Sequence, residues 1–490
     1  MLFNSLEFLI FFPIVTLVYF AIPHKIRYLW LLGASYYFYM CWNPRYALLM
    51  AASTLFTWLG GAVIAGTSNP AAKKAAVALN FTANLLILFF FKYFWFTVEN
   101  INAVLSALHM PALSPGFDVV LPVGISFYTF QALGYTVDVY RGDVKHERNI
   151  LRYALFVSFF PQLVAGPIER SKNLLHQLSA RHKFDYNRVT SGLLLMLWGF
   201  FLKLVIADRA AILVDTVYGS INSFFGFHFA VATLLFAVQI YCDFASYTTI
   251  ARGAARVMGF ELMENFNVPY FSRSIAEFWR RWHISLSGWF RDYLYIPLGG
   301  NRRGKIRKYF NIIVVFLTSG LWHGASWNFV LWGMLHGAYQ VIGDATAAAR
   351  LKCAGLLHID RKKPYYPVFQ VMLTLLLVCI AWIFFRADNI STAFFIIRKI
   401  LFDFRAELFF GGGMLQMGLG TPDLFVVFAA IAVLTLADTI KYRGIDAGKM
   451  ILGMNIIPRF AIILSLLFAT LVFGVYGVGY TASQFIYFQF

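Results

Sequence analysis

The sequence predicts an all-α, polytopic integral membrane protein with about 11–13 transmembrane helices. Hydrophobic residues make up 60% of the 490-residue chain and charged residues only 13%, whereas a soluble domain carries roughly 25% charged residues. Apolar runs recur along the chain, and Lys and Arg gather in the short segments between them. The four cysteines are scattered without metal-ligand spacing, so neither a disulfide framework nor a metal site is expected.

The candidate spans are apolar runs that approach the roughly 20 residues needed to cross a bilayer. Two of them, 28–43 and 308–322, are short, and we expect them to tilt or to extend into their polar flanks. The full set of runs is 6–22, 28–43, 46–66, 75–98, 117–139, 191–217, 228–250, 308–322, 326–345, 366–385, 422–440 and 457–477.

The loops between these runs predict the orientation of the chain. Loops 24–27 and 141–148 are basic, whereas loop 99–116 contains no Lys or Arg. Because basic loops stay in the cytoplasm, the alternation places the N-terminus outside and the odd-numbered loops inside. The same rule explains the formal net charge of +18, which favours contact with anionic lipid. We therefore expect no nucleic-acid partner.

Two segments do not fit simple spans. Run 151–168 lies between two basic stretches and contains Pro161 and Pro167, which interrupt a helix. These features predict a re-entrant hairpin that is buried in protein or lines a cavity. Segment 272–308 interleaves aromatic and basic residues, which is typical of an interfacial amphipathic helix. His283 and the Pro297-Leu-Gly-Gly300 turn instead favour a segment that enters the protein core.

His323 is the best candidate for a catalytic group, because it lies inside the otherwise apolar stretch 319–329. A titratable group at membrane depth is costly and usually functional, and histidine can accept and return a proton near neutral pH. The ordinary alternative is a core histidine that hydrogen-bonds between two helices. His283 is the best partner, since each histidine follows a Trp in a segment that is not a simple span. No G-x-S-x-G elbow, Walker loop or H-E-x-x-H helix is present.

Three other polar residues within apolar runs have structural interpretations. Asp243 could orient a histidine or pair with Arg252, and pairing is the expected role of an intramembrane acid. His336 precedes Gly337, which lets another helix approach closely, so helix packing is expected there. Lys203 is expected to extend its ammonium group to the membrane surface.

Four stretches form a combined signature, of which the third is the longest and most specific. They are Leu121-Pro-Val-Gly-Ile-Ser-Phe-Tyr-Thr-Phe-Gln131, residues 161–170, residues 278–301 and Leu321-Trp-His-Gly324. Together they resemble the membrane-bound O-acyltransferase (MBOAT) superfamily, and within it the bacterial alginate O-acetyltransferase membrane subunit.

This resemblance implies an MBOAT-type bundle with re-entrant and amphipathic helices around a central tunnel. It implies one membrane-embedded domain over 1–490, with N-terminal spans in 1–116, a motif-bearing core in 117–345 and C-terminal spans in 346–490. It places the catalytic histidine on His323 and the supporting one on His283. Further site residues are predicted to be Asn328, Trp322, Asp292 and Gln131 as supporting groups, and Arg280, Arg281 and Arg291 for binding the donor.

The resemblance also implies a reaction. An acetyl group would pass from a cytoplasmic thioester, acetyl-CoA or an acyl carrier, across the inner membrane to a hydroxyl. The thioester is expected as a substrate, with no tightly bound cofactor. The expected partners are a periplasmic or membrane-anchored acetyltransferase, an envelope polysaccharide and the lipid bilayer. Two alternatives stay open: D-alanyl transfer from a carrier protein to teichoic acid, and a non-catalytic transporter, since transporters also contain broken helices.

Overall fold

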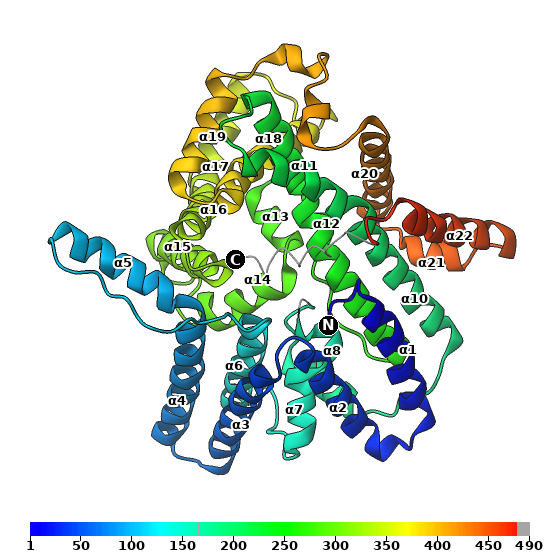
Figure 1. The fold of residues 1–490 in the computed structure, drawn as a ribbon. Coiled ribbons are helices and arrows are strands. Elements are labelled where there is room, and N and C mark those ends of the chain that lie inside the picture. Colours follow the sequence, from blue (N-terminus) through cyan, green and yellow to red (C-terminus); the bar gives the residue numbers. More distant parts are fainter. Residues whose placement is uncertain (165, 478–490) are drawn as a thin grey trace. The chain divides into compact units, whose positions relative to one another are not determined.

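The computed structural model describes residues 1–164 and 166–477, and in this part of the chain all regular structure is helical (Figure 1). The all-α prediction is therefore confirmed. Its physical reason is that a helix satisfies its backbone hydrogen bonds internally, which lipid requires. Ala165 of the second motif stretch and the end of the predicted C-terminal part lie outside the described residues. Among those described, seven helical stretches are long and apolar enough to cross a membrane: Pro44–Gly66, Pro70–Ala107, Tyr186–Gly219, Gly226–Met258, Tyr365–Arg386, Thr421–Tyr442 and Ile456–Phe473.

The chain forms two compact units. The first comprises Met1–Leu193 with Ala251–Met263, and the second comprises Leu194–Ile250 with the chain from Glu264 onward. Helices α10 (Tyr186–Phe201) and α12 (Gly226–Met258) contribute residues to both. The first unit also contains α1 (Leu6–Ala21), η1 (His24–Ile26), α2 (Arg27–Met40), α3 (Pro44–Gly66), α4 (Pro70–Leu88), η2 (Phe89–Tyr93), α5 (Phe94–Ala107), α6 (Ile125–Arg141), α7 (Ile150–Ser158), α8 (Phe160–Leu163) and α9 (Ser171–Ser179).

The second unit contains the remaining elements. They are η3 (Leu202–Ala207), α11 (Asp208–Gly219), η4 (Pro269–Phe271), α13 (Ile275–Arg281), α14 (Ile284–Phe290), η5 (Arg291–Tyr295), α15 (Gly304–His323), α16 (Trp327–Ala345), α17 (Ala347–Leu356), α18 (Tyr365–Arg386), α19 (Ile390–Phe402), η6 (Ala406–Phe409), η7 (Gly413–Met417), α20 (Thr421–Tyr442), α21 (Ala447–Leu452) and α22 (Ile456–Phe473). Three of the short elements, η2, η3 and η5, are π-helical turns, a local widening that often occurs at functional positions.

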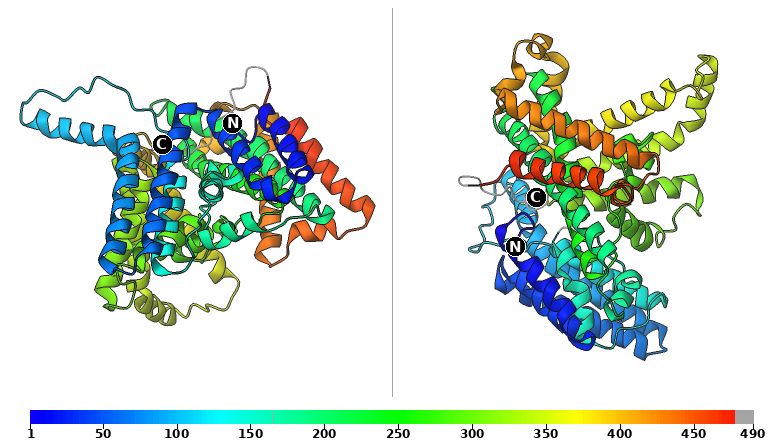
Figure 2. Two further views of the ribbon diagram at one scale, coloured as in Figure 1. Left: turned by 90° about the horizontal axis from the view of Figure 1, so that it is seen from below. Right: turned by 90° about the vertical axis from the view of Figure 1, so that its right-hand side faces the viewer.

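The helix that follows Asn69 is longer than the predicted 75–98 run. The side chain of Asn69 caps α4 by accepting a hydrogen bond from the Ala71 backbone N–H, and Pro70 occupies the first helical position. The π turn η2 then joins α4 to α5. Figures 1 and 2 show α5 turning away from the axis of α4, and Val98 is the buried residue of α5. The apolar run therefore ends in an exposed helix rather than in a longer straight span.

Two other predicted segments have different outcomes. The run expected over 117–139 becomes helical only at Ile125, because Pro122 and Gly124 precede it and Gly124 adopts a left-handed backbone with φ of 74°. The broken character of 151–168 is confirmed. Its chain forms two short buried helices, α7 and α8, with Phe159 between them and Pro161 in the first turn of α8.

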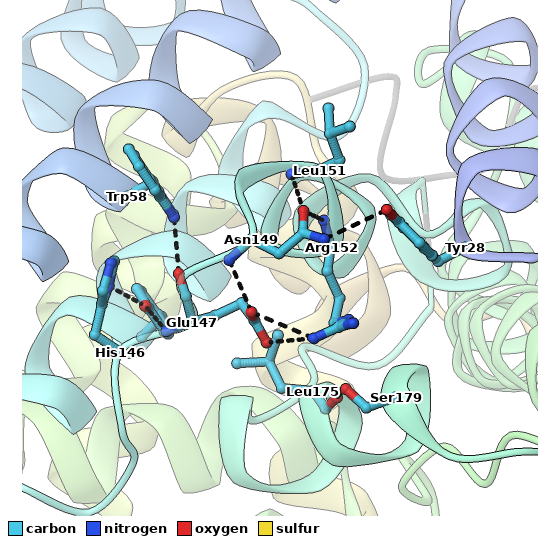
Figure 3. Close-up of polar contacts among 10 residues, drawn as sticks. Tyr28, Trp58, His146, Glu147, Asn149, Leu151, Arg152, Leu175 and Ser179 are labelled. Atoms are coloured by element: carbon cyan, nitrogen blue, oxygen red, sulfur yellow. Dashed lines mark hydrogen bonds and ion pairs between the residues drawn. The ribbon is translucent and has the colours of Figure 1, made fainter. Parts of the chain in front are cut away.

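The basic loop between α6 and α7 is fastened to its neighbours by polar contacts (Figure 3). The Trp58 indole N–H donates to the backbone carbonyl of Glu147 at 2.8 Å, and the Tyr135 hydroxyl lies 2.9 Å from His146 Nδ1. The Asn149 side chain caps α7 by accepting from the backbone N–H groups of its first turn. These contacts give the loop a defined conformation although its sequence is strongly polar.

Helices α15 and α16 approach closely because glycines face each other at their contact. A methyl group built on Gly320 would lie 2.2 Å from the carbonyl oxygen of Phe329, and one built on Gly333 would lie 2.2 Å from that of Phe316. Small residues allow this backbone approach in membrane helices. The contact fixes the position of the C-terminal end of α15, where His323 lies.

Replacing Gly333 by Val should separate α15 from α16 and destabilise the protein by about 1–3 kcal/mol or more, because the added methyl groups overlap the α15 backbone. The measurement is the thermal unfolding midpoint of purified protein in detergent. Gly343→Ala is the matched control on the same helix, since a methyl group there has nothing within 4 Å. An unchanged midpoint for Gly333→Val would contradict the close packing.

Candidate active site

His323 is the last residue of α15, at a corner between two helices. The helix ends because Gly324 adopts an extended backbone, and Ser326 then caps α16 by accepting a hydrogen bond from the Asn328 backbone N–H. The His323 side chain is only 2% exposed. The corner therefore directs a titratable group into the protein interior, as the sequence suggested for this stretch.

Aromatic rings surround the His323 imidazole. The ring centroids of Trp322, Trp332 and Phe385 lie 5.0, 4.9 and 5.7 Å from that of His323, all in edge-to-face arrangements. Such surroundings exclude bulk water, which strengthens any hydrogen bond that the imidazole makes to a reactant.

His283 lies at the N-terminal end of α14, where the chain reverses after α13. Its backbone is left-handed, with φ of 44° and ψ of 55°, a conformation that is strained for a residue other than glycine and often marks a functional site. The side chain is fully buried. The prediction that this part of segment 272–308 enters the protein core is confirmed.

The two histidines come together in the second unit. Their ring centroids lie 6.3 Å apart, and the Trp322 ring contacts both, at 5.8 Å from His283 and 5.0 Å from His323. Burial lowers the pKa of His283 to about 3, so its imidazole is neutral at physiological pH. A neutral imidazole can accept a proton or a hydrogen bond from a hydroxyl.

Similarity to known proteins agrees with this geometry. Residues 143–385 match the MBOAT, membrane-bound O-acyltransferase family. The probable alginate O-acetylase AlgI of Pseudomonas syringae pv. tomato is 38% identical over 462 residues, which cover 92% of this chain and 84% of that protein. The chain belongs to the membrane-bound O-acyltransferase family. It is a multi-pass membrane O-acyltransferase, and the resemblance carried by the four motif stretches is confirmed.

Two further relatives are named for other acyl-transfer reactions. A peptidoglycan O-acetyltransferase of Helicobacter pylori is 34% identical over 433 residues, covering 82% of this chain and 80% of that protein. A teichoic acid D-alanyltransferase of Streptococcus thermophilus is 31% identical over 255 residues, covering 49% of this chain and 60% of that protein. The similarity to the O-acetylating relatives is therefore higher and extends over more of the chain.

The predicted supporting residues have different positions. Trp322 lies between the two histidines of this acyltransferase. The Asn328 side-chain amide donates to the Ala387 carbonyl at 2.6 Å, which ties the start of α16 to the end of α18. Gln131 lies on α6 of the first unit and donates to the Phe156 carbonyl at 2.6 Å. Among the described residues, no cluster of three His, Cys, Asp or Glu side chains could hold a metal ion.

The basic residues predicted to bind the donor also differ in their contacts. Arg280 is exposed at the end of α13. Arg281 is paired with Glu277 one helical turn earlier, at 3.0 Å. Arg291 is paired with the adjacent Asp292 at 2.8 Å, in the π turn η5. Arg280 is therefore the best placed of the three for contact with an anionic donor.

The prediction that Lys203 extends to the membrane surface is wrong. Instead of extending to the membrane surface, its ammonium group lies in the interior, 1% exposed, at 2.6 Å from Asp243 and 2.8 Å from Asp208. The expectation that Asp243 is paired is confirmed with Lys203 as a partner, whereas the predicted pairing with Arg252 stays a prediction. Two buried carboxylates hold the lysine inside, because their attraction offsets the loss of hydration.

Asn265 is a residue of this site that the sequence did not reveal. It is 1% exposed, and its side-chain oxygen lies 3.2 Å from His283 Nδ1. A single Asn in a polar segment carries no periodicity or spacing that would mark it. His336, by contrast, has the expected packing role: it is fully buried, and its Nδ1 accepts a hydrogen bond from the Trp279 indole N–H at 3.2 Å.

Proposed function

We propose that this O-acyltransferase moves an acetyl group from a thioester on the cytoplasmic side of the inner membrane to a hydroxyl on the opposite side. The observation that carries the proposal is the buried pair formed by His283 and His323, whose rings lie 6.3 Å apart among aromatic side chains. The names of the relatives support an acetyl group and a glycan acceptor, since two of them are an alginate O-acetylase and a peptidoglycan O-acetyltransferase.

In this reaction His323 acts as the general base. It takes the proton of the acceptor hydroxyl while that oxygen attacks the carbonyl carbon of the thioester. The new carbon–oxygen bond forms, the carbon–sulfur bond breaks, and the thiolate leaves with a proton returned from His323. The thioester, acetyl-CoA or an acyl carrier, is a substrate, and the mechanism requires no tightly bound cofactor.

The acyl acceptor lies on the side of the membrane opposite the cytoplasm. The N-terminus and loop 99–116 lie outside the cytoplasm, since basic residues avoid that side. The acetyl group passes to a periplasmic or membrane-anchored acetyltransferase partner or directly to an envelope polysaccharide of the alginate type. D-alanyl transfer to teichoic acid is the second candidate, because a relative with that name is 31% identical over 49% of this chain.

The test is the ester content of the envelope glycans in cells that lack their own O-acetylating system. Mass spectrometry of base-released groups should find acetate when the wild-type chain is expressed with a candidate partner. Release of D-alanine instead would replace the first candidate by the second. Changed polymer export without any ester would contradict the proposed transfer of acetyl to an envelope glycan.

Arg280→Glu should raise KM for the thioester donor about five-fold or more, because an exposed charge contact contributes up to about 1 kcal/mol and the substitution reverses its sign. The value of kcat should stay unchanged, since Arg280 lies on the exposed surface of α13. Arg361→Glu, an exposed arginine outside segment 272–308, is the control. Equal values of KM for both variants would remove Arg280 from donor binding.

A further inference from the structure

Asn265 connects the segment before α13 to the start of α14. Its side-chain oxygen Oδ1 accepts from the Ser285 backbone N–H at 3.2 Å and from the Ser285 hydroxyl at 2.9 Å. The same oxygen lies 3.2 Å from His283 Nδ1. The Asn265 backbone carbonyl also accepts from the Ile284 N–H at 2.9 Å. One residue therefore contacts both the His283 ring and the backbone that carries it.

These contacts decide which atom of the amide faces the histidine. A backbone N–H can only donate, so the Asn265 atom that faces Ser285 must be the oxygen, and a flipped amide would place N–H groups against donors. An amide oxygen can only accept. His283 Nδ1 must therefore carry the hydrogen in this contact, and in a neutral imidazole the other nitrogen, Nε2, is then the acceptor.

We propose that Asn265 is a positioning residue that holds His283 as its Nδ1–H tautomer, so that Nε2 is a hydrogen-bond acceptor for the bound reactants. This inference rests on the proposed acyl transfer and narrows the role of His283 within it. A neutral ring whose hydrogen is held by Asn265 cannot donate from Nε2 to a developing oxyanion. His283 Nε2 instead accepts from a second donor group of the bound reactants, and the single proton of the reacting hydroxyl passes to His323.

The surroundings of His283 keep the ring in its neutral form. The Phe244 ring of α12 packs edge-on at 4.7 Å, and α15 contributes Trp322 and the titratable His323. Burial lowers the pKa of His283, as described above. Two carboxylates lie next to the contact residues of His283 in the sequence, and both are paired. Asp243, which precedes Phe244, lies 2.6 Å from Lys203, and Glu264, which precedes Asn265, lies 2.5 Å from Lys441.

The direct test is nitrogen NMR of the full-length protein in lipid bilayers, with all histidines labelled with nitrogen-15. The His283 signals are assigned by their loss in His283→Gln. The expected spectrum has a protonated Nδ1 and an unprotonated Nε2 for His283. A protonated Nε2 would overturn the proposal, whatever the activity of the protein.

The functional test compares Asn265→Asp with Asn265→Leu by thiol release from an acetyl thioester in the presence of the acceptor. Asp retains an acceptor oxygen, so transfer at pH 8 should stay within about three-fold of wild type, whereas Leu should lower kcat by about ten-fold or more at every pH. The added carboxylate should raise the pKa of His283 by about one to three units. A raised pKa means that the neutral form is lost at a higher pH, so Asn265→Asp should lose activity on acidification before wild type does.

Asn267→Asp is the matched control, since it adds the same charge two positions away on an exposed residue. It should leave the pH profile unchanged. A wild-type profile for both Asn265 variants would contradict the positioning role. Absence of acyl transfer by the wild-type protein would contradict the proposed function instead, while the NMR spectrum would still decide the tautomer.

Discussion

His323→Ala should abolish acyl transfer while the protein still folds and reaches the membrane. Loss of a general base lowers the rate by about 10²- to 10⁴-fold, and the aromatic surroundings of His323 leave little water to replace it. The measurement is the ester content of the envelope glycan in cells, together with the amount of each variant in the membrane fraction. Retained ester at normal abundance would return His323 to the role of a packed core histidine.

His336→Gln is the control for His323→Ala, because it distinguishes the loss of a catalytic group from the loss of packing in the aromatic cluster. His336 is also fully buried, and its ring contacts Trp332 at 5.0 Å, as the His323 ring does at 4.9 Å. A glutamine oxygen can still accept the hydrogen bond from Trp279, so transfer should fall by less than about ten-fold. Equal losses for the two variants at equal abundance would attribute the effect to the aromatic cluster and contradict the role of His323 as a base.

Lys203→Met should be the most destabilising single change in the second unit. It removes the ammonium group that lies 2.6 and 2.8 Å from two buried carboxylates, Asp243 and Asp208. Leaving a buried charge without its partner costs about 3–5 kcal/mol. We expect a strong decrease in the thermal unfolding midpoint in detergent and in abundance in the membrane.

Neutralising Asp208 and Asp243 should restore part of the stability that Lys203→Met loses. In the triple variant that adds Asp208→Asn and Asp243→Asn to Lys203→Met, no buried charge of the cluster is left, so stability should return toward the wild-type value. Asp243→Asn alone should have a smaller effect, because Lys203 keeps Asp208 as its partner. A Lys203→Met midpoint equal to that of wild type would show that the cluster does not stabilise the unit.

Much of the fold was predictable because lipid imposes simple rules on sequence. The long apolar run 366–385 became helix α18 with nearly the expected limits, whereas run 228–250 became the longer helix α12, which continues to Met258. Proline also marked a helix boundary, since Pro161 lies in the first turn of α8 directly after the break at Phe159. The start of α6 was placed too early, because Pro122 and Gly124 within the run 117–139 delay the helix to Ile125.

The amino-acid sequence alone was sufficient to predict the membrane class, the helix-forming runs, the family signature and the two candidate histidines. Only the tertiary structure brought His283, Asn265 and His323 together from separate segments, and only it showed that Lys203 is buried with two carboxylates. The physical reason is that hydropathy and helical periodicity report the local environment of a residue. Hydrogen bonds and ion pairs between distant segments depend on how helices pack, which neither pattern encodes.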